Sequence, residues 1–497
     1  MTFRRVWLVS TGLLFAVSML WSLATPIGGA PDEPAQLIKA AATVRGELTG
    51  TGVRGQPRAV VRMKVPEAFA AANKIPECFR FRPTQPASCA PKWQDSKRLV
   101  YTTTYVGRYP PLYYFFVGLP SLISASSVAV RTMRAIGAAI SAILLGLAIA
   151  AAVTWSRSRL LIVAIGVAAT PLVMFLSGAV NPNSMEIAAA VCTWVAGIVL
   201  VVEHVEHPPR ALVVVFVVAG VILELSRVLS PLWMVGILGV LWLLDPPGTR
   251  RLVWRPGPTR TGLVTLGVVG AGAGIYSLAL HTYAILPAGP RVLPSTSELH
   301  LVEAAFGHTT QYLNQAIGVF GWPDTPSPAV TIALWFAAIG TILVLGLAVS
   351  RRRQALCLAA VAAAAILVPT AIEISRARVD GIVGQARDFF PIFVGLPLLA
   401  GALLFDTSLD ARVSRRVGVL VLAGLAVAGF AAFVVALQRN VLGYTVAFDK
   451  LLHPGPHAWQ APLAPWLLII GAAAVIAAIS AWLAYLSLAP ARSAASV

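Results

Sequence analysis

Long apolar stretches without charged residues recur along this chain and determine its fold class. Many run for about 17 to 25 residues, the length that an α-helix needs to cross about 30 Å of hydrocarbon. The chain is 58% hydrophobic and 12% charged, which excludes a water-soluble globule, where about 25% of residues are charged. The alternating ten-residue pattern of a membrane β-barrel does not occur in the sequence. We therefore expect an all-α polytopic membrane protein with a single integral membrane domain over residues 1–497.

Twelve segments are expected to span the membrane, and they leave two large loops outside, at 25–134 and 281–328. The stretch 211–244 is too long for one helix across the bilayer, and Glu224, Arg227 and Pro231 interrupt it, so we expect two short helices there. The expected spans are 6–24, 135–155, 160–178, 186–202, 211–224, 229–244, 262–280, 329–349, 355–372, 389–405, 417–437 and 465–488.

The basic residues indicate the topology. The formal net charge is +18, but most basic residues cluster at the ends of apolar runs, as at Arg4/Arg5, Arg157/Arg159 and 351–353. Such clusters are retained on the cytoplasmic side. This pattern predicts a membrane protein with both termini in the cytoplasm and with membrane lipids, but no nucleic acid, as partners. The Ala-, Val- and Arg-rich composition is typical of a high-GC bacterium, so we expect the protein in the cytoplasmic (inner) membrane of a bacterium. The first apolar segment is read as an uncleaved anchor, with a cleaved signal peptide as the alternative.

The first outer loop, 25–134, is expected to contain short helices. Apolar residues recur near helical spacing between 35 and 48, which predicts a short surface helix. The apolar stretch 110–124 begins with Pro110 and Pro111 and has only 15 residues, so we expect a helix at the outer interface and keep a spanning segment as the alternative. Between residues 25 and 130 there are 13 Lys and Arg against six Asp and Glu. This positive charge would attract phosphate-bearing lipids or anionic envelope glycans.

Two of the four cysteines are predicted to form a disulfide. Cys78 and Cys89 share the first outer loop, whereas Cys192 and Cys357 lie inside apolar runs, where packing explains them. Disulfides persist in the compartment outside the cytoplasmic membrane. A Cys78–Cys89 bridge is therefore expected.

Acidic residues just beyond the first span are the strongest candidates for chemistry. Asp32 and Glu33 stand in the sequence Pro-Asp-Glu-Pro, where Asp32 could simply cap a helix. A carboxylate at the membrane–water boundary is also well placed to act on a substrate anchored in lipid. Asp32 is then the candidate base, and Glu33 is either a second catalytic carboxylate or the residue that positions the first.

The later outer loops add further candidates. Asn181, Asn183 and Glu186 lie at the start of the fourth span, where Asn-Pro is also ordinary turn chemistry. Arg227, Arg376 and Arg387 are assigned to short outer loops. Their forked guanidinium groups suit bidentate contact with a phosphate, and binding of lipid headgroups is the alternative.

Several of these motifs resemble the GT-C superfamily of membrane glycosyltransferases, which includes the aminoarabinose transferase of lipid A and the protein O-mannosyltransferases. The resemblance rests on Pro31-Asp32-Glu33, on Tyr109-Pro110-Pro111-Leu112-Tyr113-Tyr114 and on Asn181-Pro182. In addition, the segment 384–391 (GQARDFFP) looks like the Gly-Arg-Tyr-x-x-Pro signature of an uncharacterised bacterial membrane-protein family allied to it. Two positions depart from these patterns: Asn183 stands where relatives commonly have Asp, and Asp388 stands where the signature has Tyr.

The resemblance implies a GT-C-like fold and an inverting glycosyltransferase. It would move a sugar from a polyprenyl-phosphate donor to an envelope glycan, lipid or protein acceptor on the outer face of the membrane. The family's catalytic carboxylate falls on Asp32, and Arg227 falls in an outer turn where relatives often carry a basic residue. No cofactor or metal ligand set is assigned, and a divalent cation is left open. A transporter or lipid flippase, and a non-catalytic envelope-assembly protein, are the alternative functions.

Overall fold

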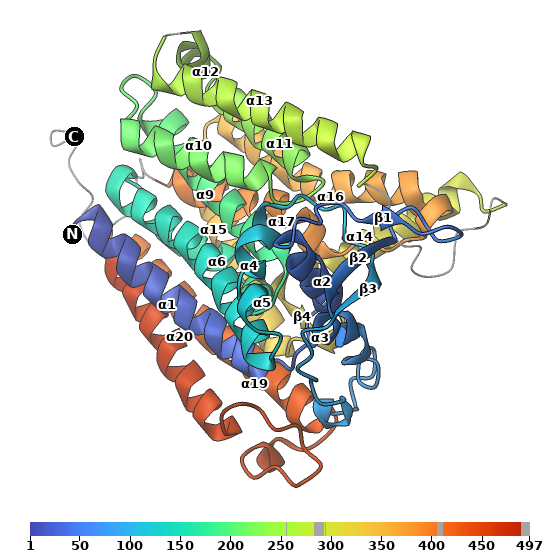
Figure 1. Ribbon diagram of the computed structural model, residues 1–497. Coiled ribbons are helices and arrows are strands. Elements are labelled where there is room, and N and C mark those ends of the chain that lie inside the picture. Colours follow the sequence, from blue (N-terminus) through green and yellow to red (C-terminus); the bar gives the residue numbers. More distant parts are fainter. Residues whose placement is uncertain (255, 283–292, 294, 405–410, 489–497) are drawn as a thin grey trace.

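The computed structural model describes residues 1–254, 256–282, 293, 295–404 and 411–488, with residues 380 and 411 described only by their backbone. Parts of the predicted second loop, 283–292 and 294, and residue 405 at the end of one predicted span lie outside the described residues. Nearly all regular structure in the described part is helical (Figure 1). The prediction of a polytopic helical membrane protein is confirmed.

Nine helical segments within the described residues are long and apolar enough to cross a membrane. One of them, Pro182–Glu203 (α9), is central, because 94% of its apolar window is buried inside the protein. The others are α1 (Phe3–Ala24), α6 (Ser127–Trp155), α13 (Pro258–Ala279), α15 (Ala329–Val349), α16 (Arg352–Asp380), α19 (Ala411–Leu442), α20 (Pro465–Leu488), and α17 (Ala386–Phe393) together with α18 (Gly395–Leu403).

Breaks in the helices explain the difference between nine spans and the twelve expected. The helices α7 (Leu160–Ala168) and α8 (Pro171–Ser177) bend by 62° at a proline that disfavours helix in the residue before it. Similarly, α11 (Ser230–Leu244) and α12 (Pro246–Trp254) bend by 118°. If each bent pair is one span, the number rises to 11. The 15-residue helix α10 (Arg210–Glu224) occupies the remaining predicted segment, so every predicted span coincides with a helix or a broken helix.

The first outer loop contains a small β-sheet that the sequence reading did not predict. The antiparallel strands β1 (Thr51–Gly52), β2 (Val61–Pro66) and β3 (Leu99–Thr104) lie in that order. Alternate residues of β2 are buried and exposed, as the period of a strand requires. The short elements of this loop are α3 (Glu67–Ala70), the 3₁₀ helices η1 (Ala71–Lys74) and η2 (Ala87–Cys89), α4 (Leu112–Gly118) and α5 (Pro120–Ile123).

The helix α2 (Glu33–Thr43) is buried, so the prediction of a surface helix is wrong. Every residue of α2 is buried, because the sheet, α3, η1 and α4 pack around it. Even Lys39 is enclosed, and its Nζ donates to the carbonyls of Leu48 and Gly107. Burial lowers the pKa of Lys39 to about 7. The helix thus forms the core of the outer loop and fixes the position of its first residues.

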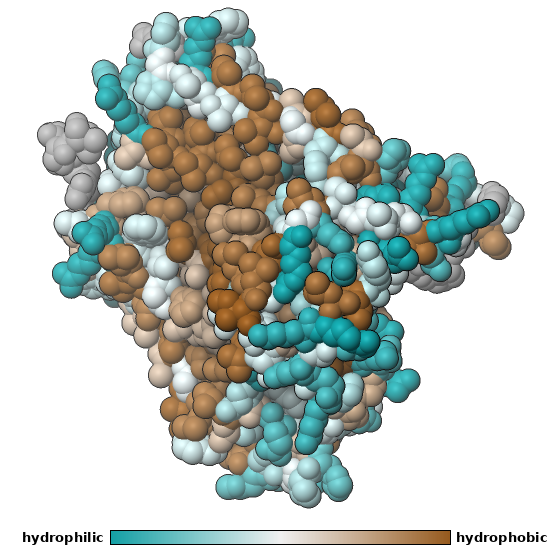
Figure 2. Space-filling model, in the orientation of Figure 1, coloured by the Kyte–Doolittle hydropathy of each residue, from teal (hydrophilic) through white to brown (hydrophobic). Residues whose placement is uncertain are grey.

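The predicted interfacial segment 110–124 forms α4 and α5. From Leu112 to Ile123 they extend over 12 residues, including Leu119 between them, or about 18 Å at 1.5 Å per residue, which is too short to cross the bilayer. Phe115, Phe116, Leu122 and Ile123 are exposed on them. In the space-filling view, a broad hydrophobic area covers the helical body, while hydrophilic side chains gather over the end that carries the sheet (Figure 2). A location of α4 and α5 at the membrane interface stays a prediction.

The second outer loop also contains ordered structure, and the helix after it is longer than expected. The helix α14 (Glu298–Gly318) is followed by the two-stranded sheet of β4 (Val319–Phe320) and β5 (Thr325–Pro326). The helix α16 continues to Asp380. Arg376 therefore lies in a helix, and its assignment to a short loop is wrong.

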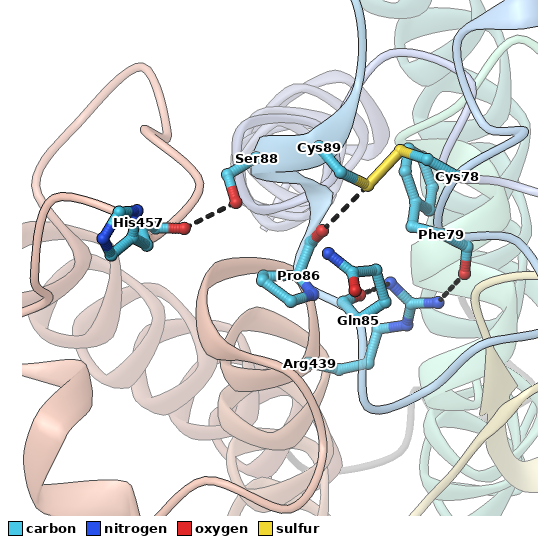
Figure 3. The surroundings of a disulfide bond; sticks show 8 residues. All are labelled: Cys78, Phe79, Gln85, Pro86, Ser88, Cys89, Arg439 and His457. Carbon is cyan, nitrogen blue, oxygen red and sulfur yellow. Dashed lines mark hydrogen bonds between the residues drawn. A yellow bond between two sulfur atoms is a disulfide. The ribbon is translucent and has the colours of Figure 1, made fainter.

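A disulfide joins Cys78 and Cys89, as predicted. The segment it closes packs on the carboxyl-terminal part of the chain (Figure 3). Arg439 of α19 donates to the carbonyl of Phe79 at 2.8 Å and pairs with Asp324 at 2.7 Å. Ser88 donates to the carbonyl of His457, close to η3 (Phe448–Leu451). These contacts form a clasp between the first outer loop, α19 and the segment that joins α19 to α20.

Candidate active site

Asp32 has an unusual backbone conformation. Its φ is 62°, in the left-handed region, which costs a residue with a Cβ roughly 1–2 kcal/mol. Although Asp32 precedes α2 as its N-cap, its side chain makes no capping hydrogen bond. Instead, Oδ1 accepts a hydrogen bond from the Tyr105 hydroxyl at 2.6 Å, and Oδ2 accepts one from Arg387 Nη2 at 2.5 Å. Because its side chain makes no capping hydrogen bond, the interpretation of Asp32 as a simple helix cap does not describe it. Strained non-glycine residues of this kind cluster at functional sites.

Glu33 is fully buried in an ion pair with Arg134 of α6. Arg134 Nε and Nη2 donate to its two carboxylate oxygens at 2.7 and 2.6 Å. The backbone N–H groups of Gly28 and Val180 donate to the same oxygens at 2.8 and 3.0 Å. Of the two roles predicted for Glu33, this geometry favours positioning of Asp32, because every described partner of Glu33 belongs to the protein framework.

Arg134 extends this framework to the end of the first span. Its remaining N–H groups donate to the carbonyls of Ser22, Thr25 and Pro26. Such a set of hydrogen bonds satisfies both members of a buried ion pair, which burial would otherwise penalise by several kcal/mol. Three separate segments thus converge just before Asp32 and fix its backbone.

Arg387 reaches Asp32 from the first turn of α17. A capping box between Gln385 and Asp388 starts this helix. The carbonyl of Arg387 accepts a hydrogen bond from Asn183 Nδ2 at 2.9 Å. An aspartate carboxylate could not donate that bond, so Asn at position 183 has a structural use here.

A second cluster of charged groups surrounds Arg227, which lies in the break between α10 and α11. Its Nη1 is 3.0 Å from Asp388 Oδ1 and 3.3 Å from Glu186 Oε2. Ser230 also donates to Glu186 at 2.7 Å. Burial opposes the charged form of Arg227, but the carboxylates of Asp388 and Glu186 outweigh it and raise its pKa.

Tyrosines from the end of the first loop lie between these clusters. Burial, followed by the negative charge of Asp32, raises the pKa of Tyr105. Burial also raises the pKa of Tyr109, which lies within electrostatic reach of Arg227, Asp32 and Asp388. Both phenols therefore stay protonated at neutral pH and can donate hydrogen bonds.

The predicted motif after the third span, which contains Asn181, Asn183 and Glu186, also belongs to this site. The backbone N–H of Asn181 donates to the Tyr113 hydroxyl at 2.9 Å, and its side chain donates to the carbonyl of Pro31 at 3.2 Å. Pro110 and Pro111 lie between Tyr109 and α4, and Tyr113 is in the first turn of α4. The structure thus brings together Asp32, Glu33, Asn181, Asn183, Glu186, Arg227 and Arg387 through a continuous set of contacts. Arg376 lies in the last turns of α16, and its phosphate-binding role stays a prediction.

Both site arginines keep a buried donor without a hydrogen-bond partner in the described part of the chain. These donors are Nη1 of Arg387 and Nε of Arg227. The carboxylate side chains of Asp32 and Asp388 are 27% and 25% exposed, so a ligand can reach the cluster from solvent. Unsatisfied guanidinium donors beside solvent-accessible carboxylates suit an anion together with a polar hydroxyl group.

Three residues of this site were not singled out from the sequence. Asp388 was noted only as a departure from a motif, Tyr105 was not considered, and Arg134 was placed just outside a span. Arg134 carried a usable signal, because an ionisable residue within an apolar helix commonly has a structural or functional partner. Tyr105 carried none, since only the strand β3 brings it to Asp32.

Behind Arg387, a buried carboxylate holds the loop between α16 and α17. Glu373 accepts hydrogen bonds from the Tyr312 hydroxyl at 2.5 Å and from the backbone N–H of Gly384 at 2.6 Å. His308 Nδ1 lies 3.5 Å from the same carboxylate. A Cβ at Gly384 would collide with both Glu373 and Tyr312.

We expect Gly384→Ala to destabilise the protein by about 1–3 kcal/mol, because the loop before Arg387 would have to move. The measurement is a thermal melt of the purified protein. Gly307→Ala in α14 is the matched control, since nothing lies within 4 Å of the added Cβ. Equal melting temperatures for the two variants would contradict the proposed close fit.

No group of three or more His, Cys, Asp and Glu side chains is arranged to hold a metal ion within the described ranges. The carboxylates of the site instead face arginines. Within these residues there is thus no ligand set for the divalent cation that the sequence left open.

Comparison with known proteins gives the family. The model of a family described as "Predicted membrane protein (DUF2142)" matches residues 15–396. The chain belongs to this family. All the site residues of this DUF2142 protein, from Asp32 to Asp388, lie within the matched region. Arg439 and the last two helices lie beyond it.

Solved structures give a weaker likeness. Two crystal structures of ArnT from Cupriavidus metallidurans, one in the apo state and one bound to undecaprenyl phosphate, are each 14% identical to this DUF2142 chain. Both comparisons cover 97% of this chain. They cover 76% of the apo ArnT chain and 75% of the bound one, with TM-scores of 0.45 and 0.41. No curated protein matches the chain.

Proposed function

We propose that this protein is an inverting glycosyltransferase that moves a sugar from a polyprenyl-phosphate donor to a cell-envelope acceptor on the outer face of the cytoplasmic membrane. The observation that carries the proposal is the pair of Asp32 and Arg387 at 2.5 Å, joined to the Arg227–Asp388 pair. It places a solvent-accessible carboxylate beside two guanidinium groups that each keep a spare donor.

In this proposal the arginines hold the phosphate of the donor. Arg387 and Arg227 can offer the buried donors Nη1 and Nε, and charge-assisted hydrogen bonds from guanidinium groups are among the strongest in proteins. The exposed aromatic and aliphatic side chains of α4 and α5 would lie beside the polyprenyl tail. Tyr109, which stays protonated, can donate to an oxygen of the donor or of the sugar, whereas Tyr105 already donates to Asp32.

Asp32 is proposed to act as the base. Its carboxylate takes the proton of an acceptor hydroxyl while that oxygen attacks the anomeric carbon. The bond between that carbon and the phosphate oxygen breaks on the opposite face, which inverts the configuration. The phosphate leaves as an anion that the two arginines stabilise, so no separate acid is needed. At the end of the step the proton is on Asp32 and the sugar is on the acceptor.

Glu33 and Asn183 would keep this arrangement in place without touching substrate. The buried ion pair of Glu33 fixes the backbone before Asp32, and Asn183 fixes the backbone of Arg387. Asn at position 183, where relatives commonly have Asp, leaves open the alternative of a non-catalytic protein. Its hydrogen bond to Arg387 gives this residue a use in an active enzyme.

Complementation of a deletion strain with Asp32→Asn, followed by analysis of the envelope glycans, tests the proposal. We expect the variant to be made in normal amounts and to leave the glycan of the deletion strain unchanged. Asp95→Asn is the matched control, because Asp95 is an exposed residue of the same outer loop. A normal glycan with Asp32→Asn at equal protein abundance would contradict the catalytic role and would favour a transporter or an assembly protein.

A further inference from the structure

One exposed face of the small outer sheet has a composition that neither the membrane nor the proposed site explains. We define the basic sheet face by Arg62 and Lys64 of β2 and by Tyr101 and Thr103 of β3. All four side chains point away from the buried side of the sheet. Lys64 lies directly opposite Tyr101, and Arg62 lies opposite Thr103.

An exposed aromatic ring lies at the centre of this face. Tyr101 is 59% exposed. The guanidinium carbon of Arg62 is 4.5 Å from the ring centroid and Lys64 Nζ is 5.9 Å from it, so both cations gather around the ring. An aromatic side chain that offers an apolar ring and a polar hydroxyl to water is typical of recognition surfaces.

The charge of the surrounding chain has one sign. Residues 48–66 and 99–108, which form the sheet and its connections, contain five basic residues and no acidic residue: Arg54, Arg58, Arg62, Lys64 and Arg108. Two carboxylates lie at the edges of this stretch. Glu47 accepts from the backbone N–H of Lys64, and Glu67 pairs with Arg98. The five cations outnumber the Glu47 carboxylate beside them, and such an excess of positive charge creates a potential that attracts polyanions.

The strand that carries Tyr101 and Thr103 continues into the candidate active site. Strand β3 ends at Thr104, and the next residue, Tyr105, donates to Asp32. At about 3.3 Å per residue in a strand, Tyr101 and Tyr105 are roughly 13 Å apart, which is the length of a few sugar rings. Arg108 also ties the site end to the hairpin by donating to the carbonyl of Arg58.

We propose that the basic sheet face binds an acidic glycan and that this glycan is the acceptor, whose hydroxyl group it presents to Asp32. The identification as acceptor rests on the proposed function, whereas the binding does not. Positive charge would hold the acid groups of the polymer, and the ring of Tyr101 would pack against a sugar ring.

An anionic lipid surface is a poorer fit to the same charge. The protein already exposes Phe115, Phe116, Leu122 and Ile123 on α4 and α5, which is the kind of surface that inserts into a membrane. By contrast, Arg62, Lys64 and Thr103 on the sheet are hydrophilic, and hydrophilic side chains gather over that end of the molecule (Figure 2).

The test measures binding of polygalacturonate, an acidic glycan, to the full chain in nanodiscs of zwitterionic lipid. The variant Arg62→Glu/Lys64→Glu reverses the charge of the face, and we expect it to weaken binding about tenfold or more, with strong dependence on salt. Lys92→Glu/Lys97→Glu makes the same change at exposed positions of the same loop and serves as the matched control. We expect the control to bind like the wild type.

Two further probes separate a glycan site from a charged surface. Tyr101→Ala should weaken binding of polygalacturonate but not of polyphosphate, a polyanion without sugar rings. Neutral dextran should not bind. The inference is overturned if charge reversal leaves polygalacturonate binding unchanged, if dextran binds equally well, or if only vesicles of phosphatidylglycerol respond to the reversal.

The outcome is distinguishable from failure of the proposed function. Asp32→Asn should bind polygalacturonate like the wild type although its transfer activity is lost. If the wild type binds polygalacturonate but transfers no sugar, the glycan site is supported and the proposed enzymatic activity is contradicted. If the Arg62→Glu/Lys64→Glu variant transfers sugar at the wild-type rate, the basic sheet face does not bind the acceptor.

Discussion

Glu33→Gln is expected to destabilise the protein by about 3–5 kcal/mol, the usual effect of removing one partner of a buried ion pair. The substitution leaves the buried Arg134 without its counter-charge. It also turns an amide nitrogen toward groups that donate, since Arg134 and the backbone N–H groups of Gly28 and Val180 all donate to Glu33. A thermal melt of the purified protein in detergent measures the effect.

An exposed ion pair provides the control. Glu67 and Arg98 pair on the surface of the same outer loop, with side chains 40% and 72% exposed. Glu67→Gln should hardly change the melting temperature, because solvent screens such pairs. Equal melting temperatures for Glu33→Gln and Glu67→Gln would contradict a stabilising role of the buried Glu33–Arg134 pair.

Asp32→Asn is expected to lower sugar transfer by about 10²–10⁴-fold, the typical contribution of a general base. The same variant should bind polyprenyl phosphate more tightly than the wild type. In the wild type, the Asp32 carboxylate accepts a hydrogen bond from Arg387 Nη2 and so competes with an incoming phosphate for this guanidinium group. Binding of undecaprenyl phosphate to the purified protein measures the second effect.

Arg387→Ala separates this competition from a general disturbance of the site. We expect it to weaken binding of undecaprenyl phosphate, opposite in sign to Asp32→Asn, although both variants break the same ion pair. Asp95→Asn should change neither binding nor transfer, since Asp95 is exposed elsewhere in the loop. Weaker binding by Asp32→Asn would contradict the competition between carboxylate and phosphate.

The helices could be predicted from the sequence because hydrocarbon imposes their length and composition on the chain directly. The apolar runs needed no knowledge of tertiary contacts, and each coincides with a helix or a broken helix. The breaks were recognisable in the same way where Pro231 or a charged residue interrupted a run. The strand β2 had a visible signal as well, since Val61, Met63 and Val65 alternate with basic residues.

The contacts of the site could not be predicted from one sequence. Asp32 and Arg387 are 355 residues apart, and no periodic pattern links them. The burial of α2 likewise depends on covering elements, so an amphipathic pattern that is typical of a surface helix was misleading. Asp32 and Arg387 became candidates through their positions at outer boundaries, but their pairing required the fold.

The clasp between the first outer loop and α19 has a consequence for biosynthesis. Arg439 and Phe79, which it joins, are 360 residues apart in the chain. At about 5–20 residues per second, the ribosome needs roughly 20 to 70 s to cover that distance. Until α19 has been synthesised, the first loop therefore lacks this contact and is held by its own sheet and disulfide. The contacts of the candidate site involve residues only up to Asp388, so they can form before Arg439 is synthesised, and the contacts of Arg439 are among the last to join the first loop to the helical body.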